Sequence, residues 1–205
     1  EPCDKAKAIA QSLIEGEKRH IFLGNVAEQH PQAAALHALV QELATLTGAT
    51  FGFLGEAANS VGGYVAGLVP TANGLNAYEM LAQPRKAYVV LGTELDRDAH
   101  NAQLATSALK QAAFSVVLTP FKDGNAAETA DALLPIAPFT ETSGTFVNAE
   151  GRVQGFNGVV APLGEARPGW KVLRVLGNVL GLSGFDFMSS EAVRDTVVSA
   201  KAEFA

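Results

Sequence analysis

A short glycine turn is the first place where this sequence could bind a ligand. Residues 92–98 read GTELDRD and follow directly on Ala87–Leu91, an apolar run that is typical of a buried strand. In an open parallel sheet, ligands bind at the carboxyl ends of strands, where a glycine lets the backbone approach a phosphate. Here Glu94, Asp96 and Asp98 would face the anion, and Arg97 compensates for them only in part. The charges favour a strand-ending turn over a phosphate site, and neither GxGxxG nor a Walker lysine occurs.

Ligands for a metal or a redox centre are few. Cys3 is the only cysteine, so the chain cannot complete an internal disulfide, an iron–sulfur cluster or a structural zinc site with thiolates. The four histidines are scattered and form neither HExxH nor HxH; they are His20, His30, His37 and His100. The sequence therefore predicts no metal site.

Two carboxylates near a predicted hairpin are the remaining candidates for acid–base chemistry. The hairpin is expected to pair Thr145–Val147 with Arg152–Gln154. Glu141 and Glu150 lie on either side of its first strand, and Arg152 begins the second. Paired carboxylates can serve as acid and base, but a neighbouring guanidinium favours an ion-pair network that stabilises the hairpin. No Gly-x-Ser-x-Gly elbow occurs, and we assign no catalytic residue.

The composition is that of a globular chain. Hydrophobic residues make up 48% and charged residues 18% of its 205 residues, and the net charge is -6. The negative charge and the lack of a basic stripe argue against nucleic acid as a partner. No apolar run approaches the roughly 20 residues that span a bilayer, so we expect no direct membrane insertion.

Short apolar strands alternate with helices along the chain, which predicts an α/β fold with a mainly parallel sheet and helices on both faces. We expect one domain over residues 1–205, with its core at 20–182 and a C-terminal helix at 190–202 that Ser190 caps. The strands are expected at His20–Leu23, Thr50–Leu54, Ala87–Leu91, Ser115–Thr119 and Ala132–Ile136. The helices are expected at Lys5–Ile14, around Leu36–Leu43, and at Ala77–Leu81, Asn101–Ala113, Trp170–Leu180 and Glu191–Ala202.

A glycine-rich segment between Gly55 and Asn76 carries one formal charge, Glu56. Loops of this length usually bind or pack against something. Exposing the apolar side chains of this segment to water is unfavourable. They are expected to be covered either by this domain or by a neighbour, and we slightly prefer the neighbour.

Three sequence motifs resemble the molybdopterin oxidoreductase superfamily: ADALLP, TETSGTFVNAEGRVQ and PLGEARPGWKVL. The motif residues are Glu141, Gly144, Thr145, Asn148, Gly151 and Arg152. The segments LGNVAEQHP and GEAANSVGGYVAGLVP resemble one branch of this superfamily, the large peripheral subunit of bacterial NADH:quinone oxidoreductase (respiratory complex I).

The resemblance implies a Rossmann-like domain that, in active relatives, binds one guanine dinucleotide arm of the molybdenum cofactor. Those relatives usually have Gly-x-Asn-Pro after the strand that corresponds to Ala87–Leu91, whereas this chain has Gly92-Thr93-Glu94-Leu95. Gly92, Thr93 and Glu94 are thus expected to be a vestigial dinucleotide loop. The complex I branch implies iron–sulfur clusters elsewhere in the parent subunit and no cofactor in this fragment.

We therefore expect a non-catalytic structural domain of the complex I subunit that supports electron transfer from NADH to quinone. Its partners would be the rest of its own subunit and other hydrophilic-arm subunits, at the cytoplasmic side of the bacterial inner membrane. The alternative is a functional molybdopterin guanine dinucleotide-binding domain of a formate dehydrogenase-like enzyme. A third possibility is a free-standing binding module that uses the glycine-rich segment.

Overall fold

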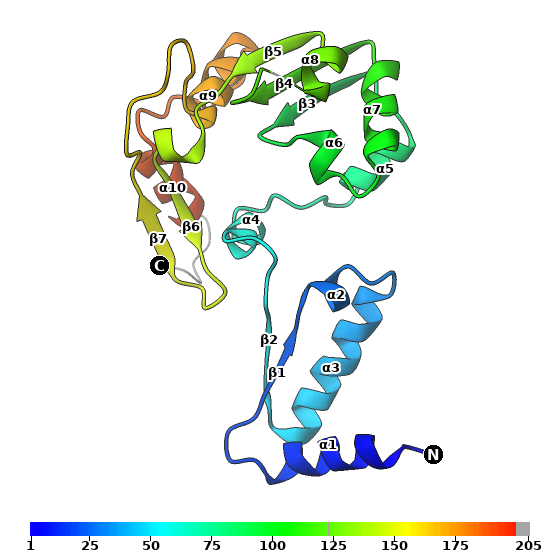
Figure 1. Cartoon of the computed structure of the whole chain (residues 1–205). Helices are drawn as coiled ribbons and strands as arrows, with labels where there is room; N and C mark the ends of the chain where they lie inside the picture. Colours follow the sequence, from blue (N-terminus) through cyan, green and yellow to red (C-terminus); the bar gives the residue numbers. More distant parts are fainter. Residues whose placement is uncertain (123, 200–205) are drawn as a thin grey trace. The chain divides into compact units, whose positions relative to one another are not determined.

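A computed structural model describes residues 1–122 and 124–199 (Figure 1). The chain divides into two compact units, of which unit 1 comprises Glu1–Gly62 with Val147–Arg152, and unit 2 comprises Gly63–Phe146 with Val153–Ala205. Each unit is described by itself. The single domain expected over residues 1–205 stays a prediction.

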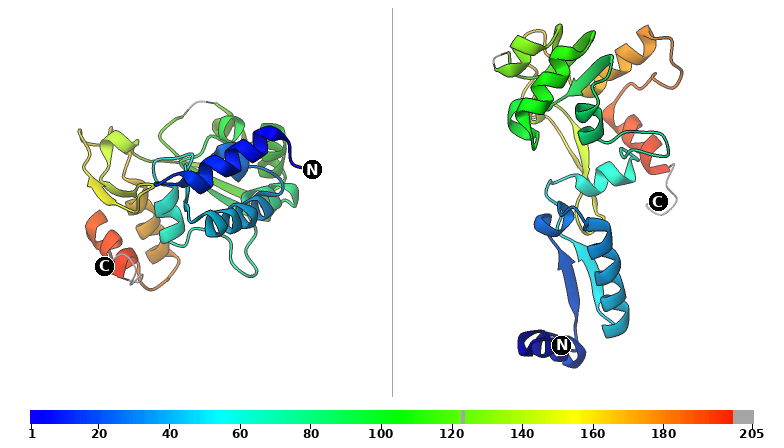
Figure 2. Two further views of the ribbon diagram at one scale, coloured as in Figure 1. Left: turned by 90° about the horizontal axis from the view of Figure 1, so that it is seen from below. Right: turned by 90° about the vertical axis from the view of Figure 1, so that its right-hand side faces the viewer.

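Unit 1 is a β–α–β arrangement in which α3 packs against both strands of a two-stranded parallel sheet (Figures 1 and 2). Gly48 ends α3 with φ +66° and lets the chain turn into the second strand. His37 on α3 contacts the rings of Phe51 and Phe53 at 5.1 and 5.0 Å between centroids. The elements of unit 1 are α1 (Asp4–Glu15), β1 (His20–Leu23), α2 (Asn25–Glu28), α3 (Ala33–Thr47) and β2 (Thr50–Phe53), and α4 (Ser60–Val65) lies where the two units meet in the sequence.

Unit 2 contains a three-stranded parallel sheet in the order β3-β4-β5 (Figure 1). The sheets of the chain are therefore mainly parallel and flanked by helices, as the alternation of elements predicts. The strands of this sheet are β3 (Ala87–Leu91), β4 (Phe114–Thr119) and β5 (Ala132–Pro135). The helices of unit 2 are α5 (Ala77–Ala82), α6 (Leu95–Asp98), α7 (Ala102–Gln111), α8 (Asn125–Thr129), α9 (Gly169–Val179) and α10 (Ser190–Ser199), and Phe139–Glu141 forms one 3-10 turn.

Side chains alternate along each strand, so the sheet has one face toward α7 and an opposite face that is only partly covered, with Val89 and Leu91 exposed on it. Val117 faces α7 in a cluster with Tyr88, Ala108 and Leu109. The next residue, Leu118, is fully buried on the opposite face. Helix α9 begins on that face, where the Cβ position of Gly169 lies 3.5 Å from Leu91. The central strand β4 is the most deeply buried of the three, with residues from Val117 to Thr119 buried, which fits its continuously apolar character.

A polar tie joins β4 to the start of β5. The Asp131 carboxylate accepts hydrogen bonds from the backbone N–H of Ser115 at 2.7 Å and from its hydroxyl at 3.1 Å. Ser115 is fully buried, so its polar groups depend on these partners. The tie fixes the position of β5 beside β4.

The helix at the end of the chain differs from the expectation in its cap. The Ser189 hydroxyl, and not that of Ser190, accepts the N–H of Ala192 at 3.1 Å, and Ser190 is already the first residue of α10. The expected cap at Ser190 was wrong by one residue. The expected end of this helix at 200–202 lies outside the described residues.

Within residues 1–122 and 124–199, no helix combines the length and the apolar character needed to cross a membrane.

Candidate functional site

The turn after β3 is closed by the chain's own carboxylates. Gly92 has φ +64° and donates its N–H to the Leu118 carbonyl at 2.8 Å, which binds the turn to β4. The backbone N–H of Glu94 then donates to Oδ2 of Asp98 at 2.7 Å. This N–H is one that an anion at the strand end would need, and an aspartate already binds it.

Arg97, the one cation of this turn, is engaged as well. Its Nη1 lies 3.3 Å from Oε1 of Glu94, and its Nε lies 3.9 Å from Oδ2 of Asp96. The sequence indicates only that this guanidinium compensates the acids in part. The structure shows that it pairs with Glu94 and Asp96, so within the turn its charge is offset by these two acids.

The hairpin motif is organised by Asn148. The hairpin consists of β6 (Gly144–Val147) and β7 (Val153–Phe156). Oδ1 of Asn148 accepts the N–H of Glu150 at 3.0 Å and that of Arg152 at 2.9 Å, so one side chain binds both ends of the turn. The sequence motif alone does not indicate that Asn148, and not a neighbouring residue, accepts these two hydrogen bonds.

Gly144 is required by a close approach of Phe156 on the facing strand. A Cβ at position 144 would lie 2.6 Å from Cζ of Phe156. Phe156 in turn contacts the ring of Phe146, at 4.9 Å between centroids. Thr145 lies between Gly144 and Phe146 on β6. Packing against Phe156 therefore explains why this position of the motif is a glycine.

The two acids that the sequence places beside Arg152 have different partners. Arg152 lies 3.8 Å from Glu150, and both side chains are exposed, so this pair stabilises the hairpin only slightly. Glu141 instead accepts the backbone N–H of Leu163 at 3.1 Å. The ion pair predicted for this hairpin is thus the one between Arg152 and Glu150, whereas Glu141 positions the loop before α9.

Replacing Gly151 by valine is expected to lower the free energy of unfolding by about 1–2 kcal/mol, because Gly151 has φ +80° and a β-branched residue is strained there. Gly151→Asn is the matched control, since asparagine tolerates the left-handed region. Urea denaturation of both variants checks this, and equal stabilities for valine and asparagine would contradict it.

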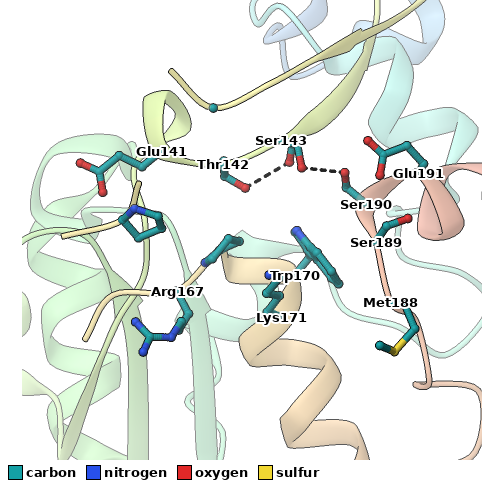
Figure 3. A pocket seen from close by; sticks show the side chains of 13 residues that line it. Glu141, Thr142, Ser143, Arg167, Trp170, Lys171, Met188, Ser189, Ser190 and Glu191 are labelled. Atoms are coloured by element: carbon teal, nitrogen blue, oxygen red, sulfur yellow. Dashed lines mark hydrogen bonds between the residues drawn. The ribbon is translucent and has the colours of Figure 1, made fainter. Parts of the chain in front are cut away.

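A second site is a polar pocket of about 490 Å³ in unit 2, between the 3-10 turn and the starts of α9 and α10 (Figure 3). The hydroxyls of Ser143 and Ser190 bind each other across it at 2.7 Å. Nε1 of Trp170 is buried, with no acceptor within residues 1–122 and 124–199. Lys171 lies over the Trp170 ring, 5.4 Å from its centroid. The sequence places Trp170 in a family motif but gives no sign of this pocket.

The pocket has polar groups but no activated nucleophile. Two of its three serines, Ser143 and Ser190, bond to each other, the third, Ser189, accepts the N–H of Ala192, and no histidine lines it. A hydrogen bond from its own backbone N–H, together with one from the Ser189 hydroxyl, lowers the pKa of the exposed Glu191 carboxyl below its ordinary value. An acid with a lowered pKa stays ionised at neutral pH and is a poor proton donor there.

Metal-binding capacity is also missing from the described part of the chain. In residues 1–122 and 124–199, no three histidine, cysteine, aspartate or glutamate side chains gather closely enough to hold an ion. Cys3 is exposed and unpaired near the start of the chain.

Comparison with known proteins gives several oxidoreductases as relatives. The chain is 34% identical over 117 residues to "Probable oxidoreductase YjgC" of Bacillus subtilis, which covers 55% of this chain and 12% of the relative. It is 32% identical over 135 residues to a nitrate reductase of Synechocystis, covering 63% of this chain and 19% of the relative. It is 36% identical over 81 residues to a putative formate dehydrogenase of Staphylococcus haemolyticus, covering 40% of this chain and 8% of the relative.

The chain thus spans less than a fifth of the length of these curated relatives. A family model described as "Molybdopterin oxidoreductase" matches residues 3–179, which include all the strands and both turns discussed above. The chain therefore belongs to the molybdopterin oxidoreductase family.

Proposed function

We propose that this chain is a non-catalytic structural domain within an oxidoreductase subunit whose electron carriers lie elsewhere. The observation that carries the proposal is the hydrogen bond of 2.7 Å from the Glu94 N–H to the Asp98 carboxylate, which closes the turn after β3. The parent that we propose is the large peripheral subunit of bacterial NADH:quinone oxidoreductase, in which the domain supports electron transfer from NADH to quinone.

The residues of this turn do not fit the dinucleotide of a pterin cofactor. A pyrophosphate at a strand end needs free backbone N–H groups and a positive potential. Here Glu94 and Asp96 pair with the single guanidinium of the turn, and the Glu94 N–H is bound to Asp98. We therefore derive no reaction step through such a cofactor, and we propose that none binds to this chain.

The second candidate function is a true cofactor-binding domain of a formate dehydrogenase-like or nitrate reductase-like enzyme. The names of the relatives favour this candidate, because they include nitrate reductase and formate dehydrogenase. The geometry of the turn favours the first. The two candidates differ in one measurable property, the affinity of the turn for a guanosine diphosphate group.

Titration with GDP, followed by calorimetry, distinguishes the two candidates. The wild-type chain is expected to bind GDP with a Kd weaker than about 1 mM. The double variant Glu94→Asn, Asp98→Ala frees the Glu94 N–H and removes two negative charges, and it is expected to bind about tenfold tighter.

The matched control removes two carboxylates from exposed positions elsewhere in unit 2, as Glu128→Ala with Asp186→Asn. This control is expected to bind GDP no better than the wild type. Micromolar binding by the wild type, with no gain in the double variant, would favour the cofactor-binding domain instead.

The same proposal predicts which proteins lie next to this chain. Tyr64 and Leu68 of the glycine-rich segment are 72% and 81% exposed, so this chain does not cover them in the structure. We propose that the rest of the parent subunit, or another hydrophilic-arm subunit of complex I, covers them. The domain would then lie on the cytoplasmic side of the membrane as a peripheral part, with the iron–sulfur clusters outside this region.

A further inference from the structure

An apolar groove of about 660 Å³ runs along α9 in unit 2 and contains three cations. Leu134, Val175, Val179 and Met188 are among its apolar lining residues. Arg167, Lys171 and Arg174 also line it, at spacings of four and three residues. Arg167 precedes α9, whereas Lys171 and Arg174 are three residues apart on it, a spacing that places two side chains on the same side of a helix. No carboxylate is among the lining residues in the part of the chain that the structure describes.

Arg174 is the least satisfied of these cations. Its side chain is half-buried on α9, and its Nε is buried without an acceptor within residues 1–122 and 124–199. No carboxylate in that part of the chain lies within ion-pair distance of it. A buried donor without a partner is unfavourable, and the cost is larger when the group is charged. Arg194, by comparison, has a partner 2.7 Å away in Asp195.

The other two cations are engaged but can still face an anion. Lys171 lies over the Trp170 ring, and Arg167 contacts two backbone carbonyls and, at 4.0 Å, Glu165. The chain has a net charge of -6, yet three cations and no carboxylate line this groove in the part of the chain that the structure describes. The groove is therefore complementary in charge to an anion and in polarity to an apolar body.

We propose that this groove is a binding site for an anion with an apolar body, of which a medium-chain carboxylate is the simplest example. Arg174 pairs with the anionic group, and the apolar part lies along Val175 and Val179. This site is separate from the turn after β3, and its occupation does not depend on the proposed function of that turn.

The test uses the single tryptophan of the chain as its reporter, because Trp170 lines the groove. Decanoate is titrated below its critical micelle concentration while the fluorescence of Trp170 is followed. Two further probes separate the contributions: acetate carries the charge without the tail, and decyl maltoside carries the tail without the charge. Decanoate is expected to saturate at a concentration about tenfold lower than either of the other probes.

The variants test which groups hold the anion. Arg174→Met keeps an apolar side chain of similar length and is expected to weaken decanoate binding about tenfold, whereas Arg174→Lys retains most of it. Val179→Asp introduces a carboxylate at an exposed position of the groove and is expected to weaken binding by repulsion, while Val179→Leu leaves it unchanged. Lys110→Met removes a cation from the exposed side of α7 and serves as the control outside the groove.

Two results would overturn the proposal. One is an equal response to decanoate and decyl maltoside, which would mean that the groove selects for the tail alone. The other is a decanoate affinity that neither Arg174→Met nor Val179→Asp changes. Circular dichroism of each variant shows that it is folded, and because Val179 is exposed, its substitution leaves the core intact.

Discussion

Replacing Leu118 by alanine is expected to lower the free energy of unfolding by about 3 kcal/mol. Leu118 lies in the central strand β4 and is fully buried. It pairs in register with Leu91 on one side and Leu134 on the other. Alanine leaves a cavity that these neighbours can fill only in part, since both belong to the same sheet.

The control for this variant is Val89→Ala on the neighbouring strand. Val89 is 59% exposed, so its truncation is expected to change stability by less than about 1 kcal/mol. Urea denaturation with a fluorescence readout measures both variants. Equal midpoints for Leu118→Ala and Val89→Ala would contradict the assignment of Leu118 to a covered part of the sheet.

Replacing Gly177 by valine is expected to destabilise the chain by about 2–3 kcal/mol, through overpacking. Gly177 is buried in α9, and a Cβ there would lie 2.3 Å from two ring atoms of Phe185. Either Phe185 or the helix must move. Because Phe187 and Met188, which line the α9 groove, lie only two and three residues after Phe185, we also expect the fluorescence of Trp170 to change.

Two further variants separate this steric effect from the weak helix propensity of valine. Asn178→Val introduces the same residue at the next, exposed position of α9 and is expected to cost less than about 1 kcal/mol. Adding Phe185→Ala to Gly177→Val removes the clashing ring, so the two substitutions together are expected to cost less than the sum of the single ones. Strict additivity would show that Phe185 does not restrict position 177.

Much of the fold could be predicted from local patterns. The strand Ala87–Leu91 has the predicted bounds, because an uninterrupted apolar run between Lys86 and Gly92 marks both of its ends. The helices α6 and α8 were missed, since four or five residues are too few to show a helical period. The tie between Ser115 and Asp131 was also missed, because it joins two residues that only the parallel pairing of β4 and β5 brings together.

The candidate sites show the same division between local and non-local information. The acidic character of the turn after β3 is visible in the sequence, but the bond from Glu94 to Asp98 requires the geometry of α6. The partner of Glu141 is the backbone of Leu163, which no charge pattern could indicate. The α9 groove was not predicted at all, because its lining comes from three separate parts of unit 2.

Under the proposed function, the closed turn would let a family member keep its fold without its ligand. Gly92 still binds β4 through the Leu118 carbonyl, so the sheet edge is maintained. Asp98 supplies an acceptor for the Glu94 N–H. The carboxylate therefore satisfies the start of α6 from within the chain.

The most direct test of the central claim is the molybdenum and guanine nucleotide content of the chain after production in cells that synthesise the pterin cofactor. The protein is purified, denatured and assayed by elemental analysis and by mass spectrometry of the released small molecules. A structural domain with a closed turn after β3 is expected to carry neither above the level of an unrelated control protein. Molybdenum and guanine nucleotide in about equimolar amounts with the chain would contradict the proposal and identify it as a cofactor-binding domain.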